Sequence, residues 1–120
     1  MTLITESVSV NPIYTGNEWT VTLTFDSAAG VIFPSGGTFT MDFRKESNSS
    51  VLVTHTMTRI NDYSASATLS DTNTNSIEAG LTFELCDRVY TSKCFFAVKR
   101  TDTSPDKVII TGLIDVVRLD

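Results

Sequence analysis

Residues 17–26 have the sequence NEWTVTLTFD, in which two kinds of side chain alternate. One row is apolar and the other carries hydroxyl groups: Trp19, Val21, Leu23 and Phe25 against Thr20, Thr22 and Thr24. Successive side chains of a β-strand point to opposite faces, so this pattern predicts a strand with one buried face over about 18–25. Threonine is β-branched and suits the solvated face of a sheet. The stretch therefore indicates a β fold.

The same period of two recurs through the chain. It predicts strands over 38–45, 51–57, 64–70, 81–87, 93–100 and 107–119, after a first extended stretch at 7–10. Turn-forming glycine, proline, serine and asparagine residues separate these segments. Short strands joined by turns are typical of a β-sandwich. We therefore expect the 120 residues to form a single domain, 1–120, with an all-β fold: an antiparallel two-sheet β-sandwich of about seven or eight strands.

One segment, DTNTNSIEAG at 71–80, breaks the alternation. Ser70 or Asp71 can cap a helical turn that ends at Gly80, with Ile77 as its apolar anchor. Asparagine and threonine are weak helix formers, so a 3₁₀ turn or a capped loop is an equal alternative. We expect at most one short helical turn, near 71–78.

The last predicted strand is apolar on both sides. Val108, Ile110, Ile114 and Val116 form one row, and Ile109, Leu113 and Val117 form the other. Such a strand is either covered on both faces or faces a partner. Our hypothesis is that Ile109, Leu113 and Val117 form an interface with a symmetry mate or a neighbouring protein. Gly112, in the middle of this strand, predicts a bulge or a close backbone approach.

Charge excludes several classes of partner. The net charge is −5 and the first basic residue is Arg44. Binding to nucleic acid needs clustered lysine and arginine, so we expect no nucleic-acid partner. No positive segment precedes an apolar run as in a secretory signal, and no apolar run approaches the roughly 20 residues of a membrane span. We expect no membrane partner.

No residue pattern predicts catalysis. His55 shares a row with Val53 and Met57, which favours a half-buried structural histidine over a general base. Cys86 has no neighbouring base that would stabilise a thiolate. Glu84 and Asp87 fall on opposite faces of one predicted strand, whereas a glycosidase pair must converge across a cleft. The sequence therefore predicts no catalytic residues, no cofactor and no enzyme activity.

The two cysteines, Cys86 and Cys94, are interpreted as reduced thiols, with a disulfide across a hairpin as the alternative. They lack CxxC spacing, and His55 is the only histidine, so no metal site is predicted.

A carbohydrate-binding or receptor-binding β-sandwich module is the alternative function, because such modules stack sugars on exposed aromatic rings. Trp19 is interpreted as a core residue, since it belongs to an inward row. Tyr14, Tyr63 and Tyr90 fall in predicted loops and are the candidate platform.

The order of segments resembles a diverse family of small Ig-like β-sandwich domains encoded among bacteriophage structural genes. The matching positions are the basic end of one strand, the entry and exit of the helical turn, the turn after the aromatic strand and the final glycine: Arg44 and Lys45, Leu69 and Ser70, Ala79 and Gly80, 100–102, and Gly112. The chain is similar in this way to the N-terminal domain of upper-baseplate tail proteins and to other small tail, fibre or head-associated proteins. It departs from the pattern at 81–93, LTFELCDRVYTSK, which would be an inserted strand or loop.

The resemblance implies an architectural role. The protein would be a structural component of the virion, assembled in the host cytoplasm, in the tail, baseplate or fibre or as a head decoration. Its partners would be other virion proteins and its own copies, in a trimer or ring. It would act through strand edges and apolar faces rather than through a pocket.

Overall fold

The structure, a computed structural model, describes residues 11–24, 33, 35, 38–101 and 107–119. The elements in these residues are β1 (Ile13–Tyr14), β2 (Trp19–Thr24), β3 (Phe39–Arg44), β4 (Val51–Thr56), β5 (Thr58–Asn61), β6 (Ser64–Leu69), α1 (Asp71–Ala79), β7 (Glu84–Cys86), β8 (Val89–Arg100) and β9 (Lys107–Leu119). The predicted β-rich fold is confirmed. The predicted extended stretch at 7–10 lies outside the described residues.

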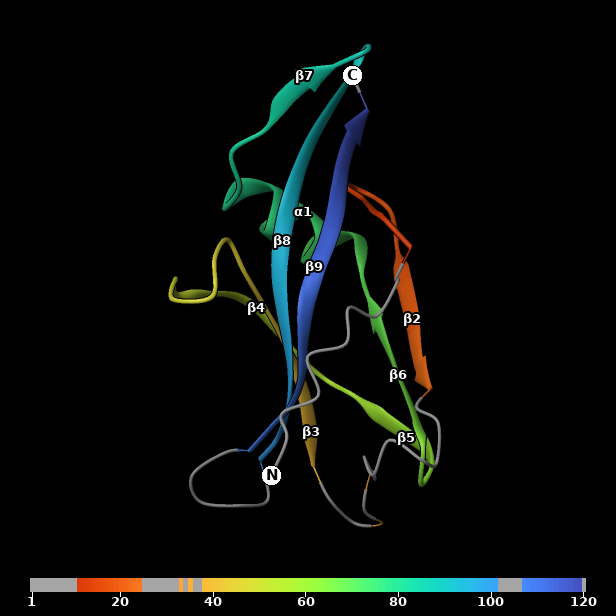
Figure 1. The fold of residues 1–120 in the computed structure, drawn as a ribbon. Helices are drawn as coiled ribbons and strands as arrows, with labels where there is room; N and C mark the ends of the chain where they lie inside the picture. The colour runs from red at the N-terminus through yellow and green to blue at the C-terminus, as the bar shows by residue number, and fades with distance from the viewer. Residues whose placement is uncertain (1–10, 25–32, 34, 36–37, 102–106, 120) are drawn as a thin grey trace.

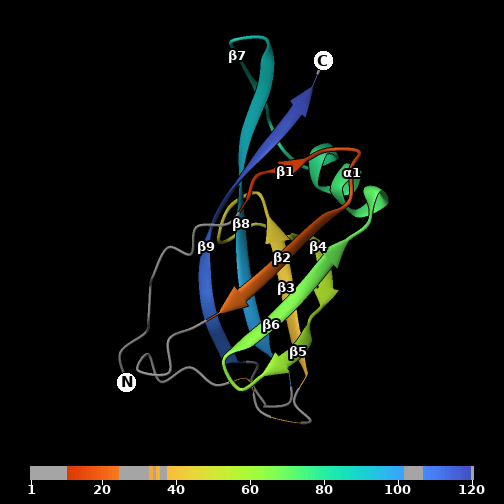
Figure 2. The same cartoon turned by 90° about the vertical axis from the view of Figure 1, so that its right-hand side faces the viewer.

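The strands form two sheets, which face each other in Figures 1 and 2. The large sheet has the strand order β1-β9-β8-β3-β4, with β7 also paired to β8, and the small sheet has the order β2-β6-β5. The small sheet is antiparallel, but β1 runs parallel to β9. The prediction of a purely antiparallel sandwich is therefore wrong at this edge, because side-chain alternation contains no information about strand direction. The described residues hold nine strands, more than the seven or eight predicted.

The inward rows of the two sheets form one core. Trp19, Val21 and Leu23 of β2 are buried, as the opening alternation predicts. Trp19 meets Phe43 of β3 edge to face, with ring centroids 5.9 Å apart and planes at 82°. Aromatic pairs prefer this geometry, and their burial supplies much of the core area. Trp19 is thus a core residue, as predicted.

The segment after β6 is a nine-residue α-helix, longer than the predicted single turn. Ser70 Oγ accepts a hydrogen bond from the Asn73 backbone N–H at 3.2 Å, and Asn73 Oδ1 accepts one from the Ser70 N–H at 3.3 Å. This reciprocal capping box satisfies two backbone donors at the helix start. Thr74 and Ile77 are buried, and α1 packs against β4 and β6. Capping and burial thus outweigh the weak intrinsic propensity, and the 3₁₀ and loop alternatives are wrong.

The predicted strand at 81–87 is mostly not a strand. Only Glu84–Cys86 pairs with β8, through a hairpin turn in which Asp87 and Arg88 have φ values of 50° and 72°. Positive φ at both central positions is the type I′ turn geometry that matches strand twist. The predicted break before residue 93 is also wrong, because β8 already begins at Val89. We call β7, residues 89–93 and residues 115–119 the arm; it projects beyond the two-sheet body (Figures 1 and 2).

A register shift in the β8–β9 pairing changes the predicted rows of the last strand. Val98 pairs with Ile110 but Lys99 pairs with Val108, so Ile109 is an extra residue. Such a bulge reverses the facing of the residues beyond it. Val108 is accordingly 39% exposed and does not share the buried row of Ile110. The predicted row of Val108 with Ile110 is wrong for this reason.

Gly112 lies directly against an aromatic ring. A Cβ atom at this position would be 2.7 Å from Phe96 Cε1, and Phe96 is the cross-strand neighbour of Gly112 on the buried face. No real Cβ tolerates that distance without movement of the ring. The close approach predicted from the sequence is therefore confirmed, and the bulge lies nearby at Ile109.

We expect Gly112→Ala to lower the free energy of unfolding by about 1–3 kcal/mol, because the added methyl group overpacks the core. Urea denaturation measures the loss. In a Phe96→Leu background the same substitution should cost less, since the smaller side chain leaves room for the methyl group. An equal cost in both backgrounds would show that the Phe96 ring is not the reason for glycine here.

Candidate interaction surface

The face of the large sheet turned away from the small sheet carries the residues predicted to form an interface. Leu113 of β9 is 58% exposed and Val117 is partly exposed on the same face. Ile109, at the bulge, is partly buried and packs against the core. The structure therefore brings Leu113 and Val117 together on one face and turns Ile109 towards the interior. Whether they contact a partner stays a prediction.

Two further residues extend this surface. Phe95 of β8 is the cross-strand partner of Leu113, and Tyr14 of β1, 46% exposed, is the partner of Val117. We call Tyr14, Phe95, Leu113 and Val117 the apolar strip. The sequence pattern does not reveal that Phe95 and Tyr14 belong to this surface, because their place beside β9 follows from strand pairing and not from alternation. The exposed Lys93–Asp115 ion pair, at 3.1 Å, lies between the two ends of the strip.

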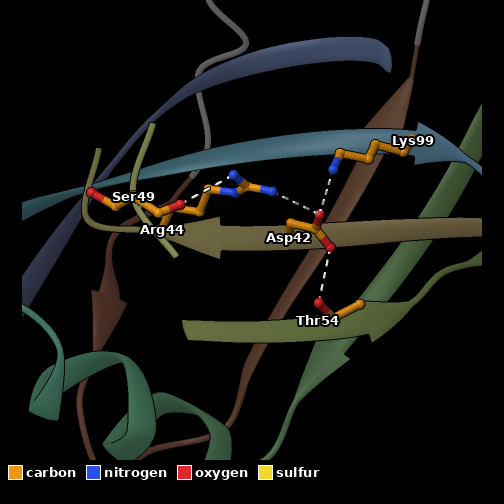
Figure 3. A network of polar contacts seen from close by, with 5 residues as sticks. All are labelled: Asp42, Arg44, Ser49, Thr54 and Lys99. Carbon is orange, nitrogen blue, oxygen red and sulfur yellow. Dashed lines mark hydrogen bonds and ion pairs between the residues drawn. The ribbon is translucent and has the colours of Figure 1, made fainter. Parts of the chain in front are cut away.

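Beside the strip, the same face carries a nearly buried charge network (Figure 3). The Asp42 side chain of β3 is 7% exposed, and its Oδ2 lies 2.9 Å from Lys99 Nζ and 3.8 Å from Arg44 Nη2. Its Oδ1 accepts a hydrogen bond from Thr54 Oγ1 at 3.0 Å. Arg44 Nη1 donates to the Ser49 carbonyl oxygen at 3.1 Å. The network thereby links β3, β4, β8 and the β3–β4 turn.

This network makes the polar half of the face rigid. Asp42 accepts from Thr54 and pairs with two cations, so the carboxylate is compensated despite its burial. Arg44 and Lys99 are held by it with only about a fifth of each side chain exposed. Long cationic side chains normally lose conformational entropy when a partner binds. Arg44 and Lys99 are already ordered by their ion pairs with Asp42, so a partner that contacts them would pay less of this entropy cost.

A shallow depression of ≈ 390 Å³ lies at the base of the arm, lined by Thr82, Glu84, Thr91, Ser92, Lys93 and Asp115. Lys93 is already paired with Asp115 inside it. The rest of the lining is three hydroxyl groups and the exposed carboxylate of Glu84, which give the depression little that would select a ligand.

The residues considered for catalysis are scattered. His55 is half-buried on β4 opposite Met41, as predicted. Glu84 lies on β7 and Asp87 in the hairpin turn, and both are exposed on the arm. Among the described residues, no group of three or more histidine, cysteine or acidic side chains is placed to hold a metal ion.

The two cysteines are free and apart. Cys86 is exposed and pairs with Val89, whereas Cys94 is buried and pairs with Ile114. The disulfide alternative is therefore wrong. Burial raises the pKa of the Cys94 thiol to about 12, and its Sγ donates to the Arg44 carbonyl oxygen at 3.2 Å. Cys94 therefore stays protonated and behaves as a small core residue.

The three tyrosines of the alternative platform lie on separate surfaces. Tyr14 is on the outer face of the large sheet, whereas Tyr90 points to its other face, where Arg118 lies 4.2 Å above the ring. Tyr63 lies in the turn between β5 and β6 of the small sheet. They form no common plane for stacking a sugar.

No helix in the described part of the chain is long and apolar enough to span a bilayer. In sequence comparisons, no protein-family model and no curated protein matches the chain.

We expect Asp42→Ala to lower the free energy of unfolding by about 1.5–3 kcal/mol, because it leaves Lys99 and Arg44 largely covered without their counter-charge. Thermal and urea denaturation measure the loss. Asp115→Ala is the matched control: it breaks an exposed ion pair on the same face and should cost less than about 1 kcal/mol. Equal losses from the two variants would mean that the network adds nothing beyond a surface pair.

Proposed function

We propose that the protein is a non-enzymatic structural component of a bacteriophage virion, with an Ig-like sandwich fold, that works by protein–protein assembly. The observation that carries the proposal is the apolar strip, in which Leu113 is 58% exposed beside a rigid charge network. Covering a large apolar side chain that is exposed on a sheet face lowers the free energy of the assembly.

The chemistry of the face supports assembly through it. Interface cores are poor in charge and rich in aromatic and large apolar residues, and their rims are polar. The apolar strip has this composition, with the Asp42 network on one side. Stable contacts bury about 800 Å² on each partner. Four partly exposed side chains supply less than that, so the contact includes the Lys93–Asp115 pair between the ends of the strip and the Asp42 network at its rim.

The resemblance to phage Ig-like domains supports the place of action. On this basis the proposed location is the tail, baseplate or fibre, or the head surface, with assembly in the host cytoplasm. Its partners are other virion proteins and its own copies, in a trimer or a ring, since virion parts repeat around rotation axes. Three positive groups on the face are engaged by carboxylates: Arg44 and Lys99 by Asp42, and Lys93 by Asp115. That engagement disfavours phosphate binding.

The rival function, a carbohydrate-binding or receptor-binding module, has less support. Trp19 is in the core, and the three tyrosines do not share a surface. No observation among the described residues favours it over assembly.

We expect Leu113→Asp to reduce self-association while leaving the subunit folded, because it replaces the most exposed apolar side chain of the strip with a charge. Multi-angle light scattering measures the mass, and thermal unfolding checks the fold. Thr20→Asp, on the exposed face of the small sheet, is the control and should leave the mass unchanged. If the Leu113→Asp oligomer is unchanged, or the subunit unfolds instead, the strip is not the contact.

The virion assignment is tested separately, by mass spectrometry of purified phage particles divided into head and tail fractions. Stoichiometric recovery in one fraction is the expected result. Absence from both fractions, combined with glycan binding that depends on Tyr14, would overturn the assignment in favour of the carbohydrate-binding module.

A further inference from the structure

The inner face of the arm carries a row of three side chains across three strands. Leu85 of β7 pairs with Tyr90 of β8, and Tyr90 pairs with Arg118 of β9. Cross-strand partners point to the same face, so the three side chains are neighbours. This row is on the opposite side of the large sheet from Leu113. Tyr90 lies four residues before the buried Cys94 and Arg118 four residues after the buried Ile114, and side chains an even number of residues apart along a strand share a face.

Arg118 is held in place by two aromatic rings. Its guanidinium carbon lies 4.2 Å from the centroid of the Tyr90 ring and 5.3 Å from that of the Phe83 ring. Both distances are within the range of cation–π attraction. Phe83 itself packs against the core. The orientation of the guanidinium is therefore set before any ligand arrives.

Only one edge of this guanidinium is engaged. Arg118 Nε lies 3.8 Å from Glu78 Oε1 of α1, and Thr15 Oγ1 donates to the same oxygen at 3.3 Å. Among the described residues, neither Nη nitrogen of Arg118 has a hydrogen-bond partner, and 40% of the side chain is exposed. Four N–H donors in a fixed plane are thus available, in the geometry that binds a carboxylate with two parallel hydrogen bonds.

The rest of the row indicates which other group a ligand with such a carboxylate would carry. Leu85 is 63% exposed, the largest exposed fraction among the large apolar side chains of the described residues. It lies two strand spacings from Arg118, or about 10 Å. Tyrosine and arginine dominate the binding energy of protein interfaces when an apolar neighbour excludes water around them. Leu85, Tyr90 and Arg118 together form such a combination.

We propose that the row Leu85, Tyr90 and Arg118 is a second docking surface, which binds a segment of another protein carrying a carboxylate with an apolar side chain two or three residues away. The partner's carboxylate pairs with the Nη edge of Arg118, and its apolar side chain covers Leu85. A nucleic acid is disfavoured, because the row carries one cation, Arg118, whereas a phosphate backbone is bound by clustered lysine and arginine. The surface is separate from the apolar strip and does not depend on its role.

The test is an NMR titration of the full chain with the blocked peptide acetyl-Leu-Ser-Asp-amide and its neutral match, acetyl-Leu-Ser-Asn-amide. We expect the acidic peptide to shift the Arg118 Nε–H and Tyr90 ring signals and to bind about tenfold or more tightly than the neutral one. Arg118→Gln should remove this preference. Leu85→Ser changes an exposed side chain and should weaken binding of both peptides while the fold remains. Lys93→Gln is the matched control, because it removes a positive charge from the other face of the arm.

Several results would overturn the proposal. Equal binding of the two peptides, or binding unaffected by Arg118→Gln, would exclude a carboxylate site. Sodium acetate binding as tightly as the acidic peptide would reduce the surface to a small-anion site without an apolar half. Self-association that disappears in Arg118→Gln would make a second copy of this chain the occupant.

Discussion

The structure depends on the pairing of β8 with β9. The register runs from Val89 opposite Leu119 to Arg100 opposite Lys107, so the two longest strands are joined along almost their whole length. Three other strands of the large sheet pair directly with this hairpin, β3 and β7 with β8 and β1 with β9, and β4 pairs with β3. At Gly112 this pairing leaves no room for a side chain, since a Cβ atom there would lie 2.7 Å from Phe96 Cε1. Glycine at this position therefore lets the Phe96 ring pack directly against the backbone of β9.

The length of this hairpin also explains where the candidate surfaces lie. Where the small sheet covers it, the inner row is core, as at Cys94 and Phe96. Further along the same strands the cover ends, and the inner row becomes Tyr90 and Arg118, which are partly exposed. The outer row carries Leu113, which is exposed, and Val117, which is partly exposed. The two proposed surfaces are therefore opposite faces of one pair of strands, which is the arrangement expected of a subunit that joins two neighbours.

Much of the fold is predictable from the sequence, because alternation directly records which side chains are buried. The β2 row of Trp19, Val21 and Leu23 is an example, and so is the position of the helix beside Ile77. What alternation does not record is pairing. The parallel contact of β1 with β9 and the extra residue at Ile109 both arise from register. The polar residues 91–93 have the composition of a turn, yet they continue β8. All three pair with β9, and Thr91 also pairs with Glu84 of β7.

The candidate surfaces also divide into residues that alternation reveals and residues that only strand pairing reveals. Leu113 and Val117 are visible in the sequence because they make the last strand apolar on both sides. Phe95, Tyr14 and the Arg118 row become visible only when neighbouring strands are placed. Asp42 is harder still to recognise, since a carboxylate in an outward row is normally solvated and its burial depends on Lys99 and Thr54 from other strands.

The unbroken course of β8 and β9 from the body into the arm has a mechanical consequence. Hydrogen bonds of an antiparallel pair lie perpendicular to the strands. A force that pulls β9 along its length against β8 therefore loads the whole ladder in shear at once, whereas a force across the strands opens the ladder one hydrogen-bonded pair at a time. The β8–β9 pairing therefore resists sliding of the strands more than it resists peeling.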